Sequence, residues 1–232
     1  MMYRSIALLA ASVLSAVIAN KEKSGLSSRS YPAPRSCGFT DAFSLATADS
    51  WTHVKIAGGL KDPRGITVDT EGNLLVIESG KGLTAFTFGH DGCIASSKVL
   101  IDNADLNHGI TLTPDGKQLV VSSETTAWRY LYDAATQVLS NEEVVIKNMQ
   151  LGGHSTRTVV IPPQTPNLLL ASVGSLTNLD WESLDKNVGR SLVKVFDLGD
   201  LPAGGFDYRS QGWFLGYGLR NEVAVVVDSN NM

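Results

Sequence analysis

Six polar side chains stand at one phase of a repeating pattern in this chain of 232 residues. An imidazole among them can act as a general base, and a fixed guanidinium can stabilise a developing negative charge. Taken singly, any of them could have a structural role, such as a hydrogen bond to a neighbouring loop. Their shared phase predicts that they meet at one site. The six residues are Arg64, Asn107, His108, His154, Arg220 and Asn221.

Short β-strands are the elements that would position these groups. Residues 62–80 (DPRGITVDTEGNLLVIESG) align with residues 107–125 (NHGITLTPDGKQLVVSSET) as strand, Glu-Gly or Asp-Gly turn, and strand. A weaker copy with a Pro-rich turn occupies 155–175, and a fourth copy begins at 222–231. The first copies are roughly 45 residues apart, which is the period of four-stranded propeller blades.

The repeats therefore predict an all-β fold, a β-propeller of the six-bladed type. Residues 180–200 are interpreted as an insertion, after which the outer strands resume at 192–198. Six blades would need about 270 residues, so we expect a fragment truncated to about the first half of the propeller. If the chain were instead the whole product, it would have to dimerise or misfold, since its terminal blades lack caps. A β-sandwich of evenly spaced hairpins is the alternative.

The N-terminal residues predict secretion. Arg4 precedes a short apolar run, so residues 1–19 are interpreted as a signal peptide, followed by a flexible leader at 20–36. The propeller domain is assigned to 37–232. Cys37 and Cys93 are the two cysteines, and an oxidising compartment favours a disulfide between them. We expect an extracellular protein with no membrane attachment after cleavage of the signal.

Composition and motifs exclude several other functions. The net charge is −4 and no basic stripe is present, which makes nucleic acid and anionic membranes poor partners. No Walker or dinucleotide-binding glycine pattern occurs, so ATP and nicotinamide cofactors have no visible site. Ser155, next to His154, lacks the strand–turn–helix context of a nucleophilic serine.

Three segments resemble the glucose/sorbosone dehydrogenase family, and within it the fungal pyrroloquinoline quinone (PQQ)-dependent pyranose dehydrogenases. The order H-x-x-R followed by G-x-R-N is more specific than a generic propeller repeat. The resemblance covers 37–231 and about the first half of such a domain. The segments are LNHGITLTPDGKQLVVSS (106–123), GGHSTRTVVIPPQTPNLLLASVGS (152–175) and GYGLRNEVAVVVD (216–228).

The resemblance implies a sugar dehydrogenase that uses PQQ and Ca²⁺. His154 matches the family's general base, which takes the proton of a sugar hydroxyl while a hydride passes to the quinone. Arg220 matches the cation beside the reactive quinone carbonyl, and Asn221 its hydrogen-bonding neighbour. Asn107 matches another site amide, with Arg64 and His108 as further rim residues.

Other parts of the implied site have no residues assigned in this chain. The calcium ligands are expected beyond residue 232. The electron acceptor is either a separate partner or an attached haem domain.

Two alternatives remain open. A calcium-dependent lactonase propeller would centre on acidic and amide ligands, whereas this rim carries histidine and arginine. A truncated propeller could also be non-catalytic, as a binding module.

Overall fold

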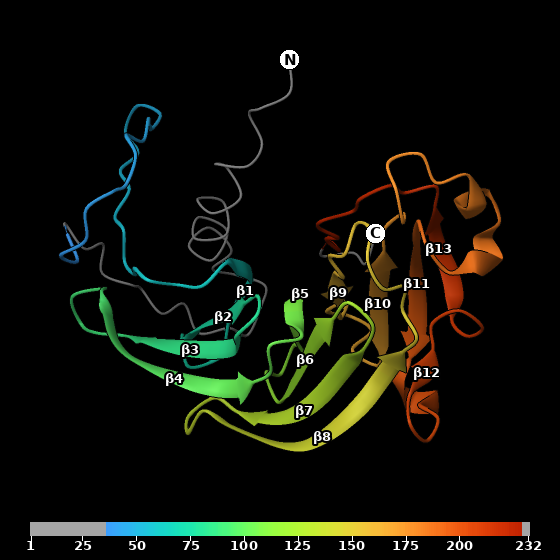
Figure 1. The fold of residues 1–232 in the computed structure, drawn as a ribbon. Coiled ribbons are helices and arrows are strands. Elements are labelled where there is room, and N and C mark those ends of the chain that lie inside the picture. Colours follow the sequence, from blue (N-terminus) through green and yellow to red (C-terminus); the bar gives the residue numbers. More distant parts are fainter. Residues whose placement is uncertain (1–35, 229–232) are drawn as a thin grey trace.

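The computed structural model describes residues 36–228, which form an all-β molecule with only short 3₁₀ helices. Three sheets, antiparallel except for one short strand of the second, follow one another along the chain and lie along an open arc (Figure 1). The all-β prediction is confirmed. The sheets do not form the two facing layers of a β-sandwich. The predicted signal peptide, and all of the predicted leader except Ser36, lie outside the described residues. No helix in 36–228 has the length and apolar character needed to cross a membrane.

The first sheet is a four-stranded meander whose strands pair in sequence order. Its first turn is the predicted Glu-Gly turn, in which Gly72 has a φ of 82°. Asp69 Oδ1 accepts hydrogen bonds from the main-chain N–H groups of Glu71 and Asn73, which closes this turn. The strands are β1 (Pro63–Val68), β2 (Leu74–Glu78), β3 (Gly82–Phe88) and β4 (Ile94–Asp102).

The second sheet repeats this order and gains a fifth strand. Gly116, with a φ of 70°, forms the predicted Asp-Gly turn between its first two strands. The short β12 (Phe206–Asp207), which comes much later in the chain, pairs in parallel with the outer strand β8. Four strands come from one stretch of sequence: β5 (Leu106–Leu112), β6 (Gln118–Ser123), β7 (Ala127–Asp133) and β8 (Val138–Lys147).

The third sheet has the same order but is interrupted by two long connections. The loop 174–191 contains the 3₁₀ helices η1 (Trp181–Leu184) and η2 (Lys186–Val188), and 198–212 contains η3 (Leu198–Asp200) and β12. The outer strands resume at 192, as predicted for the insertion. The sheet consists of β9 (Val159–Val160), β10 (Leu168–Val173), β11 (Leu192–Asp197) and β13 (Trp213–Tyr217).

The predicted fourth repeat is not a strand in the described residues, which corrects the expectation for 222–231. Residues 222–228 have no regular secondary structure. They lie beside the inner end of the third sheet, where Thr158 Oγ1 donates a hydrogen bond to Val223 O over 3.0 Å. An inner blade strand forms its ladder with the strand that follows it in sequence, and the described chain reaches only residue 228.

Apolar side chains fill the two spaces between neighbouring sheets. One cluster joins the first and second sheets and contains Leu75, Ile77, Leu83, Leu119 and Val121. The other joins the second and third sheets through Val120, Ile146, Leu169, Leu192 and Phe196, among others. These residues alternate along their strands, so the two faces of the second sheet pack on different neighbours. The sheets are therefore held in series, which fixes the relative positions of their inner strands.

Two glycines allow the inner strands to approach one another closely. A Cβ at Gly65 would lie 1.9 Å from His108 O, and a Cβ at Gly109 would lie 2.3 Å from Arg157 O. Gly65 and Gly109 lie in the two segments that the repeat pattern aligns, 62–80 and 107–125. Each of these glycines lies against the main chain of the next inner segment.

A segment without strands precedes the first sheet. Residues 36–60 extend away from it (Figure 1, blue to cyan). The predicted disulfide between Cys37 and Cys93 is present and ties this segment to the hairpin end of the first sheet.

Candidate functional site

Arg64 and His108 are neighbours at the inner edge of the first two sheets. His108 Nε2 lies 2.9 Å from Val223 O, so Nε2 donates and Nδ1 is the acceptor nitrogen. Burial lowers the pKa of His108 more than the Val223 hydrogen bond raises it, and the positive charge of Arg64 lowers the pKa further. Nδ1 is buried without a hydrogen-bond partner among residues 36–228. His108 is therefore a neutral imidazole that joins the second sheet to the segment after Arg220.

Asn107 links the second sheet to the loop that contains His154. Its Nδ2 donates a hydrogen bond to Ser155 O over 2.8 Å. Its Oδ1 is buried and has no partner in the described part of the chain. The amide thus has one acceptor left for a ligand.

His154 is held by two hydrogen bonds to one residue of the third sheet's loop. Its main-chain N–H donates to Ser175 O over 3.0 Å, and its Nδ1 lies 2.9 Å from the same carbonyl oxygen. A carbonyl only accepts, so Nδ1 carries the proton and Nε2 carries the lone pair. Ser175 Oγ, 3.0 Å from Nδ1, donates its own proton to Thr177 O. The ring is therefore fixed in the tautomer that a general base requires at Nε2.

Arg220 lies on the other side of the same residue. Ser175 N–H donates to Arg220 O over 2.8 Å, and the Arg220 guanidinium donates from Nη2 to Asn178 Oδ1. A Cβ at Gly174 would lie 2.8 Å from the Cβ of His154 and 2.9 Å from Arg220 O. Residues 174–175 therefore bring the main chains of His154 and Arg220 together.

Two site residues were not identified from the sequence. Ser175 and Asn178 lie in the loop 174–191, ahead of the insertion predicted at 180–200, and no motif distinguishes them from the other polar residues there. Their roles depend on contacts with residues 21 and 42 positions away. Asn221, which was predicted, is exposed at the rim next to Arg220.

Arg157 of the H-x-x-R pattern is a structural residue in this fold. Its side chain is 0% exposed and donates to the main-chain carbonyls of Glu124, His154 and Gln150. Burial lowers its pKa, although the nearby Glu124 and Glu222 carboxylates oppose the shift. Arg157 thus holds the loop of His154 through hydrogen bonds to its main-chain carbonyls.

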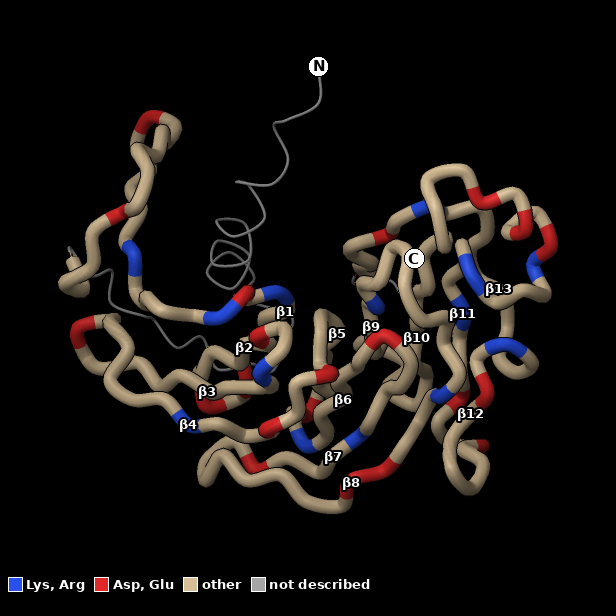
Figure 2. The backbone as a smooth tube through the Cα atoms, in the orientation of Figure 1, with Lys and Arg blue, Asp and Glu red and all other residues tan. Residues whose placement is uncertain are grey.

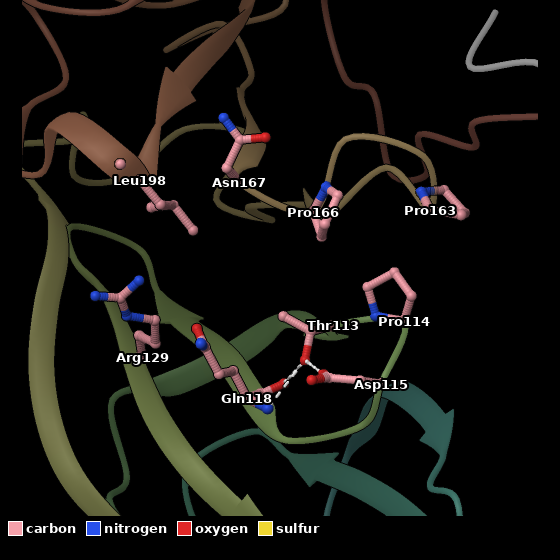
Figure 3. Close-up of a pocket in the computed structure, with 10 residues that line it drawn as sticks. Thr113, Pro114, Asp115, Gln118, Arg129, Pro163, Pro166, Asn167 and Leu198 are labelled. Carbon is pink, nitrogen blue, oxygen red and sulfur yellow. Dashed lines mark hydrogen bonds between the residues drawn. The ribbon is translucent and has the colours of Figure 1, made fainter.

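Two pockets lie at different ends of the sheets. A pocket of about 230 Å³ adjoins Arg220 and is lined by Asn178, Tyr217 and Ser183, among others. A larger one, of about 470 Å³, lies between the turn at Pro114 and the turn at Pro163 and Pro166 (Figure 3). Thr113 follows β5 whereas His108 stands near its start, so the larger pocket is about 16 Å along the strand from the rim. It contains none of the predicted site residues.

No group of three His, Cys, Asp or Glu side chains within 36–228 is arranged to hold a metal ion. The structure therefore assigns no residue to the Ca²⁺ that the resemblance implies.

Comparisons with known proteins identify the family of this chain. A model of the TrAA12-like family matches residues 45–232. The pyrroloquinoline quinone-dependent pyranose dehydrogenase of Coprinopsis cinerea is 43% identical over 187 residues, which is 80% of this chain and 26% of that protein. The pyrroloquinoline quinone-dependent sugar dehydrogenase of Hypocrea jecorina is 31% identical over 209 residues, 87% of this chain and 46% of that protein.

Solved structures of the same kinds of protein also match this chain. The holo form of the pyranose dehydrogenase PQQ domain from Coprinopsis cinerea matches with a TM-score of 0.82 and 41% identity, over 84% of this chain and 49% of that one. The calcium structure of the Trichoderma reesei enzyme of carbohydrate-active family AA12 matches with a TM-score of 0.71 and 32% identity, over 76% and 45%. The chain thus spans between a quarter and a half of the relatives it matches.

Proposed function

This chain belongs to the TrAA12-like family, and from that membership we propose that it functions as a PQQ-dependent sugar dehydrogenase, with His154 and Arg220 at its reacting centre. One observation carries the proposal: a single residue, Ser175, accepts from the His154 ring through its carbonyl oxygen and donates its N–H to the main-chain carbonyl of Arg220. This arrangement brings the imidazole of His154 and the main chain of Arg220 together at one rim. The pairing is what oxidation of an alcohol requires, because a proton leaves the hydroxyl as a hydride leaves the carbon.

The residues at this rim fit a polyanionic quinone. PQQ carries carboxylates and quinone oxygens, and Arg220, Asn221 and Arg64 are exposed donors at the rim. The buried Oδ1 of Asn107 and Nδ1 of His108 lack partners among residues 36–228 and offer acceptors to a sugar hydroxyl or to water. When bound there, PQQ would supply the hydride acceptor. We assign it to Arg220, Asn221, Asn107, His108 and Arg64.

The chain's own residues then have separate tasks. His154 accepts the sugar hydroxyl proton at Nε2, while its Nδ1–H stays on Ser175 O and keeps the ring in place. Arg220 presents its charge where negative charge develops, oriented by Asn178. The three sheets would be consecutive blades of a six-bladed propeller. Their match to 49% of the solved PQQ domain supports this number.

Extracellular location is part of the same proposal. The disulfide between Cys37 and Cys93 suits an oxidising compartment, and the apolar N-terminal run of the sequence suits a secretory signal.

Titration of the 232-residue chain with PQQ in the presence of Ca²⁺ tests the function. We expect saturable binding, followed through the quinone absorbance, and bleaching on addition of an aldose. His154→Ala should lower turnover about 10²–10⁴-fold and leave the Kd for PQQ nearly unchanged, because the lost group is a base and not a cofactor ligand. His90→Ala is the matched control, since His90 is exposed in a turn of the first sheet.

Two outcomes would contradict the proposal. Near-normal turnover of His154→Ala would remove the base assignment. Binding of PQQ without oxidation of any aldose would favour a binding module over an enzyme.

A further inference from the structure

We infer that Asn178 is a positioning residue, which orients the Arg220 guanidinium toward the rim without cancelling its charge. The inference rests on the proposed function of Arg220. It comes from the loop 174–191, which connects the two middle strands of the third sheet and is longer than its counterparts in the other sheets.

Arg220 needs an external constraint to have a defined direction. The residue is exposed, and an arginine side chain has many rotamers in that situation. Its main-chain carbonyl is fixed by Ser175, but this bond does not select a side-chain rotamer. Among the residues that the structure describes, the acceptor of its guanidinium is Asn178 Oδ1. This one hydrogen bond therefore determines where the positive charge lies.

Asn178 can hold Arg220 because its own loop is held by an ion pair and several hydrogen bonds. Two residues further on, Asp180 forms a bidentate ion pair with Arg190, with Oδ2–Nε and Oδ1–Nη2 distances of 2.5 and 2.9 Å. The two side chains are only 5% and 6% exposed. The ion pair with Arg190 lowers the pKa of Asp180 to about 2, so the pair is charged at neutral pH. This ion pair joins the middle of the loop, at Asp180, to its C-terminal end, at Arg190.

Further bonds hold the loop to the strands on both sides of it. Asp180 Oδ2 accepts from Leu176 N–H over 2.8 Å, next to the residues that hold His154. Tyr217 at the end of β13 donates its hydroxyl to Ser183 O over 2.9 Å. Figure 2 shows the loop's acidic and basic residues gathered at one corner of the molecule, beside β13. Asn178 is thus presented by a loop that is anchored before and after it.

The amide is chemically suited to this task. A carboxylate at the same position would hold the guanidinium equally well, but it would place a negative charge in contact with it. That charge would oppose the field which Arg220 directs at the reacting atoms. A neutral acceptor orients the cation and leaves its full charge available. Asn178 and Arg220 both line the 230 Å³ pocket.

The test combines a spectroscopic readout with turnover. In the ¹⁵N-labelled chain without cofactor, the Nε–H resonance of Arg220, identified with Arg220→Lys, should have a high heteronuclear NOE. In Asn178→Ala the NOE should fall to the value of the exposed Arg64, and in Asn178→Asp it should stay high. Asn187→Ala is the matched control, because Asn187 lies in the same loop and its hydrogen bonds within the described residues 36–228 go to Asp185 and not to Arg220.

Turnover separates orientation from charge. With PQQ bound, Asn178→Ala should lose about tenfold in kcat, and Asn178→Asp about 10–100-fold despite its ordered arginine. An unchanged Arg220 NOE in Asn178→Ala would overturn the inference, and an unchanged kcat in Asn178→Asp would overturn the argument for a neutral acceptor. If the wild-type chain bound no PQQ, the proposed function would fail, while the NOE would still decide whether Asn178 positions Arg220.

Discussion

At the scale of single residues, the candidate site depends on main-chain groups that a sequence does not display. Ser175 holds His154 through its carbonyl oxygen and Arg220 through its N–H, so its side chain matters less than its place in the loop. His154 and Arg220 could be predicted because their types and phase recur. Ser175 and Asn178 could not, since many other polar residues share their local pattern.

Glu222 is a buried carboxylate that no sequence motif indicated. Burial raises its pKa to about 7, and the nearby Arg157 opposes the shift only in part. Both carboxylate oxygens are buried, and interactions with its own main chain and with Ser172 lower the pKa by less than burial raises it. The folded state therefore prefers the protonated form. The carboxyl binds its proton more tightly in the folded than in the unfolded chain, where its pKa is near 4.5.

This preference predicts a pH-dependent stability. The folding free energy contributed by Glu222 is fully present below pH 4.5 and is lost as the pH rises through 7. Glu222→Gln should therefore unfold like the wild type at pH 4 and be more stable by about 1–2 kcal/mol at pH 8, after discounting for partial exposure. Urea unfolding at the two pH values measures the difference. The exposed Glu143→Gln should show no such gain, and a Glu222→Gln variant that loses stability at pH 8 would contradict the prediction.

At the scale of elements, the repeat pattern predicted the strand, turn and strand order of the first two sheets. In the fold, Gly65 and Gly109 from the two aligned segments each lie against the main chain of the next inner segment. The parallel pairing of β12 with β8 was not predictable. It is only two residues long and joins segments about 60 positions apart, with no periodicity to indicate it. Local patterns specify strands, whereas such contacts depend on where a long loop returns.

A substitution at Gly109 tests this close approach. In Gly109→Ala the new Cβ would lie 2.3 Å from both Arg157 O and Ser122 Oγ, and the former is main chain that cannot rotate away. We expect a loss of about 2–4 kcal/mol in the free energy of unfolding, because the second and third sheets must separate. Gly199→Ala serves as the control, since its nearest neighbour is the Asp197 side chain at 3.1 Å. Equal losses in the two variants would show that the inner strands are not in tight contact.

At the scale of the whole molecule, the sheets are packed in series and the N-terminal segment is attached separately. Its internal hydrogen bonds join His53 to Asp41 and Lys55 to Thr40. The disulfide fixes its beginning to Cys93, and Lys61 fixes its end, through Glu78 and Gly80. The pairing of the cysteines was predictable because only two occur. The path of the chain between these two attachments was not, since 38–60 have no periodicity.

The disulfide should accordingly protect the segment more than the sheets. In a Cys37→Ser/Cys93→Ser double variant we expect a loss of about 2–4 kcal/mol in the free energy of unfolding. Without the cross-link, the unfolded chain between the two positions has more conformational entropy, which favours unfolding. Under native conditions, trypsin should cleave after Lys55 at least about tenfold faster, because the segment opens locally while the apolar clusters between the sheets stay intact. Cleavage after Lys98, within β4, should be unchanged. Dithiothreitol should reproduce the faster cleavage in the wild type and have no effect on the variant. Equal acceleration at Lys55 and Lys98 would mean that the disulfide holds the first sheet together as well as the segment in front of it.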